Sequence, residues 1–181
     1  MLANQIAQAQ AIIQQGGVIA YSTDTIIGLG CDPTNSCAVE RILWLKQRSL
    51  DKGLILLVAD IGALEDFSQP LSSTQIEKIN SAHSPTTWLL PKNTRVAKWI
   101  SGMHDSVAMR VSQHPIATAL SQATGAIVSS SANFSSYANA ENTDQLRNWF
   151  GPYLDYVIIG EPGTGMPSEI HDLLGGKQHR K

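Results

Sequence analysis

Three cationic side chains, Lys46, Arg48 and Lys52, lie within seven residues of this 181-residue chain, in the stretch LKQRSLDKG. The stretch follows a predicted helix and leads into a predicted buried strand. One interpretation is that these cations complement the negative end of the helix dipole. The other is that they clamp phosphate groups, since Arg offers a planar fork of donors and Lys a mobile point charge. A clamp of this kind suits a triphosphate.

Arg110 is a fourth cation, and it lies inside the apolar strand SVAMRV. A guanidinium that is buried among strand residues without a partner costs free energy, so it needs an anion. An acidic side chain or a ligand could supply that anion. Arg110 therefore favours the phosphate-clamp interpretation of the neighbouring cations.

Small hydroxyl side chains gather at the ends of several predicted strands. They occur at 22–25 (STDT), at 129–133 (SSSAN), at 84–87 (SPTT) and at 167–172 (PSEIHD). Each run could be a solvated turn, because Ser and Asn are common turn residues. Together they could instead line one pocket with neutral donors and acceptors, which would suit a sugar, an amide or a zwitterion.

The first of these runs interrupts a strand in AYSTDTIIGLG, residues 20–30. We interpret the interruption as the place where a substrate sits, with Thr23 and Thr25 as pocket hydroxyls. Gly28 and Gly30 would let the backbone pass close to a ligand and to a neighbouring strand.

Several common kinds of site are excluded by the motifs that the sequence lacks. Neither GxxxxGK[ST] nor GxGxxG occurs, which excludes a P-loop or Rossmann nucleotide site. There is no GxSxG elbow and no protein-kinase signature. Cys31 and Cys37 are too far apart for a CxxC pair, and the five histidines form no metal-binding pattern. We therefore expect no zinc site, no protein-held metal and two free cytosolic thiols.

Composition indicates an ordinary soluble globular protein, with 43% hydrophobic and 15% charged residues. The length fits one domain with a proper core. No apolar run approaches the ~20 residues that span a bilayer, and the N-terminus does not resemble a secretion signal. The net charge of −2 attracts no nucleic acid globally, although one face can still carry a basic patch. We expect a cytoplasmic protein without membrane contact.

The elements that must position these side chains alternate along the chain. Expected strands span 17–21, 54–59, 86–90, 106–111, 126–130 and 155–159. Expected helices span 4–15, 35–47, 73–82, 94–101, 114–124 and 142–150. Strands separated by helices of this length indicate an α/β fold. The apolar run GLILLVAD indicates a strand that is covered on both faces. We expect a single domain over 1–181, with a loose tail from about 175 to 181.

Six motifs, in order, resemble the YrdC/TsaC family of threonylcarbamoyl-AMP synthases, in particular its short single-domain TsaC branch. They are YSTDTIIGLG, KQRSLDKG, SPTT, VAMR, SSSANFSS and PSEI, and they cover residues 21–170. The chain departs from the family pattern at five positions. Pro or Gly of the pattern is replaced by Ser22, Ser49, Ser84 and Ser136, and its Glu is replaced by Asp24. We expect looser loops rather than lost ligands, with the carboxylate at position 24 retracted by one methylene.

The resemblance implies a twisted mixed sheet flanked by helices, with a concave basic pocket. It implies that ATP, L-threonine and bicarbonate or CO₂ give threonylcarbamoyl-AMP and pyrophosphate, with Mg²⁺ bridging the phosphates. No covalent nucleophile is implied, and Lys46 and Arg48 would act by positioning and charge stabilisation. The implied ATP-binding residues are Lys46, Arg48, Lys52, Thr87, Ser131 and Asn133. The implied threonine-binding residues are Thr23, Arg110 and Ser129, and further expected lining residues are Tyr21, Asp24, Thr25 and Ser168.

The implied product would pass to a threonylcarbamoyl transferase complex that modifies tRNA beside the anticodon. Two alternatives stay open at this point. The same cations could hold a duplex RNA or tRNA backbone in a non-catalytic binding module. The chain could also be a threonine or nucleotide sensor that binds its ligand without turnover.

Overall fold

One mixed sheet of nine strands organises the computed structural model, which describes residues 2–134, 137–161 and 163–180. Its strand order is β7-β1-β2-β6-β3-β5-β4-β8-β9. The strands are β1 (Ile19–Tyr21), β2 (Gly28–Gly30), β3 (Ile55–Val58), β4 (Thr86–Pro91), β5 (Ser106–Val111), β6 (Ile127–Ser131), β7 (Tyr156–Ile158), β8 (Glu169–Asp172) and β9 (Gln178–Arg180). Three pairs are parallel, β1 with β7, β3 with β5 and β4 with β8, and the other pairs are antiparallel. Ser136 lies outside the described residues.

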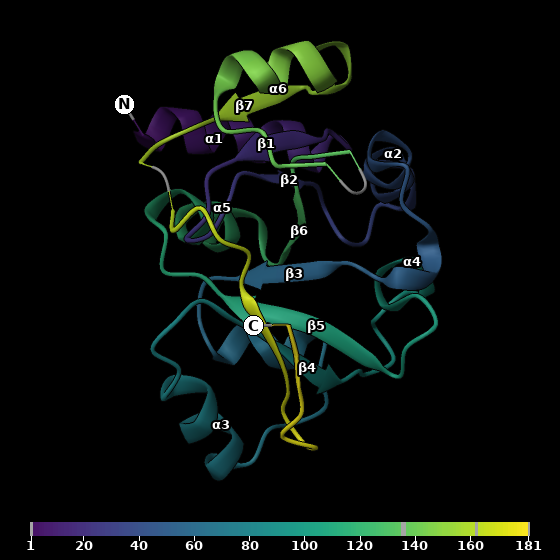
Figure 1. Cartoon of the computed structure of the whole chain (residues 1–181), viewed down its shortest axis with the longest axis vertical. Helices are drawn as coiled ribbons and strands as arrows, with labels where there is room; N and C mark the ends of the chain where they lie inside the picture. Colours follow the sequence, from purple (N-terminus) through teal and green to yellow (C-terminus); the bar gives the residue numbers. More distant parts are fainter. Residues whose placement is uncertain (1, 135–136, 162, 181) are drawn as a thin grey trace.

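Helices flank this sheet (Figure 1). The α-helices are α1 (Leu2–Gln14), α2 (Ser36–Lys46), α3 (Ser73–Asn80), α4 (Lys98–Ser101), α5 (Pro115–Thr124) and α6 (Thr143–Phe150). Three short 3₁₀ helices are η1 (Leu50–Lys52), η2 (Gly62–Asp66) and η3 (Gly151–Tyr153). Within the described residues, none of these helices is long and apolar enough to cross a membrane. The α/β mixed sheet expected from the sequence is confirmed.

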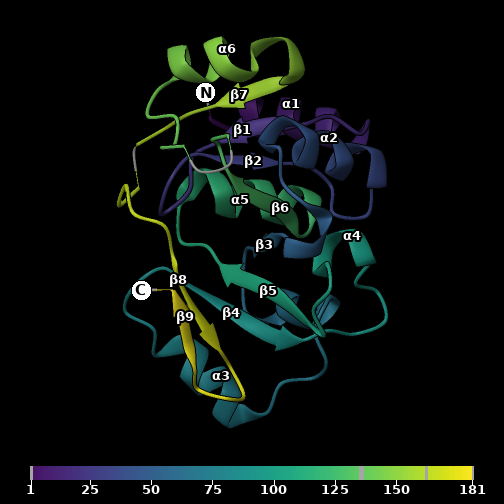
Figure 2. The ribbon, with the colours of Figure 1, turned by 45° about the vertical axis from the view of Figure 1, so that its right-hand side comes forward.

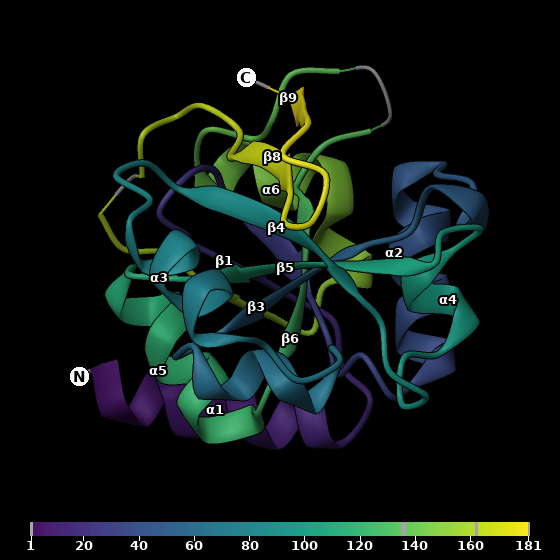
Figure 3. The same cartoon turned by 90° about the horizontal axis from the view of Figure 1, so that it is seen from below.

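Two apolar cores fix the sheet between its helices. Helices α1 and α5 lie side by side, and Figure 3 shows them together at the bottom of the view, with β8 and β9 at the top. Ile13 and Leu120 of these helices pack with Leu57 and Ile127 of the sheet, all at 2% exposure or less. A larger core joins the sheet to α2, α4 and α6, with Ile42, Ile100 and Phe150 among its members. The central strands are therefore held rigidly.

Helix α2 begins and ends as its sequence predicts. Asn35 is the N-cap, and its side-chain oxygen accepts a hydrogen bond of 3.0 Å from the Ala38 backbone N–H. The helix ends at Gln47, which adopts a left-handed φ of 50°. This turn redirects the chain, so that the side chains of Lys46 and Arg48 reach different parts of the structure.

The expected helix over 94–101 is shorter in the structure, where only α4 is helical. Asn93 explains the difference, because its side-chain oxygen accepts from Arg95 N at 2.9 Å and its carbonyl accepts from Val96 N at 3.3 Å. These bonds form a turn that competes with helix, as Asn side chains often do.

The stretch 20–30 contains two strands and not one interrupted strand. Strands β1 and β2 pair antiparallel, with Ile19 opposite Gly30, and residues 22–27 form the connection. Gly30 is required there, because a Cβ at this position would lie 2.5 Å from Cε1 of Tyr21 and 2.9 Å from the Val128 carbonyl. The expected close backbone approach at this glycine is confirmed.

The C-terminal segment differs from the loose tail expected from its sequence. Residues 178–180 form β9, an edge strand that pairs antiparallel with β8 and lies beside it in Figure 2. Neither β8 nor β9 shows a long apolar run in the sequence, which is why both were missed. That the whole chain acts as one domain stays a prediction.

Candidate active site

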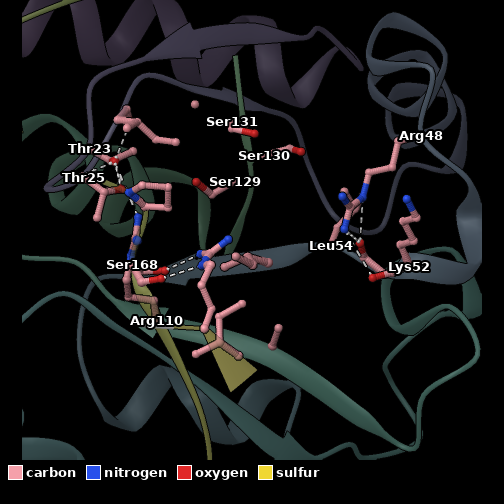
Figure 4. Close-up of a pocket in the computed structure, with 18 of the residues that line it drawn as sticks. Thr23, Thr25, Arg48, Lys52, Leu54, Arg110, Ser129, Ser130, Ser131 and Ser168 are labelled. Atoms are coloured by element: carbon pink, nitrogen blue, oxygen red, sulfur yellow. Dashed lines mark hydrogen bonds between the residues drawn. The ribbon is translucent and has the colours of Figure 1, made fainter. Parts of the chain in front are cut away.

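A cavity of about 570 Å³ is lined by residues from seven strands, β2, β3, β4, β5, β6, β8 and β9. It therefore lies where several strand segments that are distant in the sequence converge. Figure 4 shows two groups of side chains in it. Arg48 and Lys52 form a basic end, while Thr23, Thr25 and Ser168 lie together at the other end, which we call the hydroxyl end.

The lining carries a strong positive charge. Four cationic side chains line the cavity, Arg48, Lys52, Arg110 and Arg180, and no Asp or Glu does so among the described residues. Burial lowers the pKa of Arg180, and the positive charges of Arg110 and Arg48 lower it further. These side chains repel one another without a ligand, so the cavity favours an anion. The protein as a whole has a net charge of −2, so this charge is local.

The basic end is built on the turn that follows α2. The Arg48 backbone N–H donates to the Leu43 carbonyl at 2.9 Å, and this bond fixes the start of the segment. Its guanidinium then donates to the Gly53 carbonyl from Nε at 3.3 Å and from an Nη atom at 3.0 Å. Partial burial lowers the pKa of Arg48 from its ordinary value. The guanidinium is thus oriented by the backbone while its remaining donors stay available.

Lys46 lies behind the cavity and not among its lining residues. The side chain is 3% exposed, and its ammonium donates to Asn133 Oδ1 at 2.6 Å, to the Asn133 carbonyl at 3.0 Å and to Ser131 Oγ at 3.1 Å. It also contacts the Ser131 carbonyl. Ser131 and Asn133 themselves line the cavity. Lys46 therefore fixes the turn that presents these two side chains.

Because Lys46 holds the turn that carries Ser131 and Asn133, we expect the function of this turn to depend on pH. Burial lowers the pKa of Lys46 to about 8 from 10.5, and the charge of Arg48 contributes. Above about pH 8 the amine loses its charge and one of its three donors, which weakens its hold on the four surrounding oxygens, so we expect kcat to fall there. Stability changes in the other direction: the folded protein releases this proton before the unfolded chain does, so the free energy of unfolding contributed by Lys46 rises from about pH 8 to 10.5.

The measurement is a kcat profile from about pH 7 to 10 at saturating substrates, with thermal midpoints over the same range. Lys46→Arg is the matched variant, because it keeps its charge while substrate ionisation affects both proteins alike. We expect the decline near pH 8 in the wild type and not in the variant. The same decline in both proteins would show that Lys46 is not its source.

At the hydroxyl end, Arg110 and Thr23 lie close together. Thr23 Oγ1 donates to the Ile26 carbonyl at 2.7 Å and lies 3.0 Å from Thr25 Oγ1. An Nη atom of Arg110 lies 3.5 Å from Thr23 Oγ1 and 3.5 Å from Asp24 Oδ1. Asp24 is thus the anion that the buried Arg110 requires.

Arg110 retains donor capacity despite this ion pair. It is 4% exposed, and its Nε has no hydrogen-bond partner among the described residues. Burial lowers its pKa, and the nearby Asp24 and Tyr21 partly offset that effect. Arg110 lines the cavity, whose described lining has no carboxylate, so its guanidinium is suited to an anionic ligand.

Ser168 is held by two neighbours. Its hydroxyl lies 2.8 Å from Thr87 Oγ1. Arg180 donates from Nε to the Ser168 carbonyl at 2.8 Å and from an Nη atom to Ser168 Oγ at 3.1 Å. Thr87 is completely buried and does not line the cavity, so it can act on a ligand only through Ser168.

Two expected lining residues lie elsewhere, which corrects the sequence interpretation. Tyr21 is completely buried, and its hydroxyl donates to the Val128 carbonyl at 3.2 Å. Burial raises its pKa well above the ordinary range. Asp24 lines a separate small cavity of about 160 Å³ and also accepts from Ser112 Oγ at 3.0 Å. Its role at the main cavity is exerted through Arg110.

The structure brings most of the predicted residues to one cavity. The predicted residues that line it are Thr23, Thr25, Arg48, Lys52, Arg110, Ser129, Ser131, Asn133 and Ser168. Arg180 and Asn139 also line the cavity, although neither is predicted from the sequence. The basic tail HRK was the available signal for Arg180, but nothing in the sequence places that tail against β8.

Comparison with known proteins identifies the family. The sequence model of the Sua5/YciO/YrdC family, described as telomere recombination, matches residues 11–180. The chain belongs to this family. The resemblance to YrdC/TsaC proteins in the six motifs is thereby confirmed.

Several proteins of known sequence are similar to this chain over nearly its whole length. A threonylcarbamoyl-AMP synthase of Nitrosococcus oceani is 42% identical over 97% of this chain and 97% of its own length. One from Cellvibrio japonicus is also 42% identical, over 96% of this chain and 93% of its own length.

Solved structures show the same fold. Sua5 of P. abyssi complexed with L-threonine has a TM-score of 0.87 at 29% identity and is matched over 96% of this chain. The present chain spans about half of that protein, 52% of its length. E. coli YciO, at 24% identity, matches with a TM-score of 0.83 over 97% of this chain and 90% of its own.

Proposed function

We propose that this member of the family is a threonylcarbamoyl-AMP synthase, an enzyme that joins ATP, L-threonine and bicarbonate or CO₂ and releases pyrophosphate. The observation that carries the proposal is the cavity, whose described lining has four cations, several hydroxyls and no carboxylate. Its volume of about 570 Å³ falls in the range of small-molecule sites. Similarity to curated synthases over nearly their full length supports the same activity.

The basic end would hold the phosphates of ATP. Arg48 offers a fork of donors, and Lys52 adds positive charge. Arg180 adds positive charge from its position at Ser168. These groups would stabilise the charge that develops on the departing pyrophosphate. Ser131 and Asn133, held in place by Lys46, would contact the nucleotide.

The hydroxyl end would hold threonine. Arg110 would bind its carboxylate, and Thr23 and Ser129 would contact its polar groups. The threonine amine adds to CO₂ and loses a proton, giving a carbamate. An oxygen of that carbamate then attacks the α-phosphorus, the bond to pyrophosphate breaks, and threonylcarbamoyl-AMP forms. Positioning both substrates in one enclosed cavity matters because the carbamate is short-lived in water.

The residues present do not form a protein-held site for Mg²⁺. No group of three His, Cys, Asp or Glu side chains suited to a metal occurs among the described residues. Hard cations prefer oxygen ligands, mainly carboxylates, and the described lining of the cavity has none. Mg²⁺ would therefore have to arrive bound to the phosphates of ATP, and we assign no step to it.

The reaction product also suggests partners. Threonylcarbamoyl-AMP would be consumed by a threonylcarbamoyl transferase complex that modifies tRNA, in the cytoplasm where both occur.

The experiment that tests this function is pyrophosphate release with ATP and bicarbonate, with and without L-threonine. We expect release that depends on threonine. Release that is absent, or that is the same without threonine, would overturn the proposal. A sensor would bind threonine or nucleotide under these conditions and release no pyrophosphate.

The cationic lining of the cavity also favours a second candidate function, that of a duplex RNA or tRNA-binding module. An RNA complex that rests on several phosphate contacts weakens steeply with salt. We therefore propose titrating duplex RNA at two salt concentrations. A complex insensitive to salt would rule this candidate out, whereas steep salt dependence together with absent pyrophosphate release would favour it.

A further inference from the structure

A short segment after β7 lies directly against the residues of the hydroxyl end. We call Gly160, Glu161 and residues 163–165 the strap. Its backbone N–H groups at Thr164 and Gly165 donate to the carbonyls of Asp24 and Thr25 at 3.1 and 2.9 Å. These bonds run alongside Thr23 and Thr25, whose side chains line the cavity.

Gly163 allows the closest part of this contact. A Cβ atom at position 163 would lie 2.4 Å from the Thr23 carbonyl oxygen, 2.5 Å from the Asp24 carbonyl carbon and 2.6 Å from the Thr25 nitrogen. All three are backbone atoms, which cannot rotate away as the end of a side chain could. Only glycine therefore fits here without moving the segment that carries Thr23 and Thr25.

Ser22 provides a second connection, and it is one of the departures from the family pattern. The side chain is 3% exposed, and its Oγ accepts from Gly160 N at 3.1 Å. Its backbone N–H donates to the Ile158 carbonyl at 3.2 Å. A proline could make neither bond, because it has no N–H and no hydroxyl. The Ser22 hydroxyl therefore ties the strap to residues 22–25, and its N–H ties the same residues to β7. The family's proline would provide neither bond.

His114 holds the strap from the other side. Its Nδ1 accepts from Ile116 N at 3.2 Å, which leaves Nε2 to donate to the Glu161 carbonyl at 3.0 Å. His114 is 8% exposed and is the N-cap of α5, which packs in the core with α1. The strap is thus anchored to a rigid element at the same time as it contacts residues 22–25.

We infer that the strap fixes the backbone of residues 22–25 and thereby sets the affinity for the amino-acid substrate, with Ser22 and Gly163 as positioning residues. The inference rests on the proposed function for the identity of that substrate. Both residues act through Thr23 and Thr25 and contact no reacting atom. Because Arg48 and Lys52 lie at the other end of the cavity in Figure 4, ATP binding is affected much less.

The test is calorimetric binding of L-threonine together with the KM values for threonine and ATP in Gly163→Ala and Ser22→Ala. We expect Gly163→Ala to raise the Kd and KM for threonine at least about tenfold, and Ser22→Ala about threefold to tenfold, as for one lost hydrogen bond. The KM for ATP should stay within about twofold in both. Gly151→Ala is the matched control, since a Cβ there would lie 4.0 Å from Arg147 Cβ, an ordinary van der Waals distance.

Each outcome decides between the two proposals. Threonine affinity that is unchanged in both folded variants, or KM values for threonine and ATP that rise together, would overturn the inference about the strap. If Gly163→Ala does not fold, Ser22→Ala alone decides. A wild-type protein that binds no threonine would overturn the proposed function and this inference with it, whereas wild-type binding with unchanged variants overturns the inference alone.

Discussion

Arg48→Ala lowers kcat/KM for ATP in threonine-dependent pyrophosphate release by at least about tenfold, equivalent to roughly 1.4 kcal/mol of transition-state stabilisation. The physical reason is that Arg48 is oriented by the Gly53 carbonyl and presents its remaining donors to the cavity. Negative charge builds on the leaving pyrophosphate, and a fixed guanidinium stabilises that charge more than the ground state.

The control for this prediction is Arg95→Ala. Arg95 is largely exposed, and its ion pair with Asp66 spans 3.7 Å at the surface. The Arg95→Ala variant also removes one arginine charge, but from a position outside the cavity, so the kcat/KM of this variant should match the wild type. Wild-type turnover in Arg48→Ala would refute the assignment of Arg48 to the phosphates.

Arg110→Gln is expected to lower kcat/KM for threonine by about a hundredfold, which corresponds to ~2.7 kcal/mol and to one or two lost hydrogen bonds from a charged donor. Arg110 is buried, faces the cavity and has an Nε without a partner among the described residues. The measurement is steady-state pyrophosphate release over a range of threonine concentrations at saturating ATP.

Arg110 also neutralises Asp24, so the single variant alone cannot separate the two roles. The double variant Arg110→Gln with Asp24→Asn removes both charges and leaves no unpaired carboxylate. If Arg110 binds threonine, the double variant stays as impaired as the single one. Recovery of activity in the double variant would show that Arg110 serves only as the partner of Asp24.

Much of the fold follows from local patterns that survive in the structure. The apolar run around residues 55–58 formed a central strand because both of its faces are covered, with Leu56 in one core and Leu57 in the other. The strand over 106–111 packs one face into the core through Val107 and Met109 and lines the cavity with the other. The hydroxyl clusters at the ends of strands came together because β2 and β6 are neighbours in the sheet, with Gly28 opposite Ser131.

The remaining parts depend on contacts between distant segments. Arg180 reaches the cavity only because β9 pairs with β8, and its exposed three-residue strand has no apolar pattern. Tyr21 and Ser22 lie next to each other at the end of β1, yet one is core and the other holds the strap. The sequence predicts Tyr21 as a lining residue and Ser22 as a replacement that loosens its loop, and the side-chain packing overturns both expectations.

Lys46 is a further residue whose contacts could not be predicted from its spacing in the sequence. Its spacing from Arg48 suggests that both side chains contact phosphate, but the left-handed Gln47 between them sends them to different places. Lys46 contacts the Ser131 and Asn133 turn, while Arg48 lines the cavity. We therefore propose Arg48 and Lys52, and not Lys46, as the side chains that contact phosphate directly.

The central claim is that one cavity joins ATP, threonine and inorganic carbon. The most direct test is mass spectrometry of the product formed from ATP, ¹³C-bicarbonate and ¹⁵N-threonine. The account predicts an adenylate that carries both labels, formed together with one pyrophosphate for each molecule of product. Pyrophosphate release without a doubly labelled adenylate would contradict it.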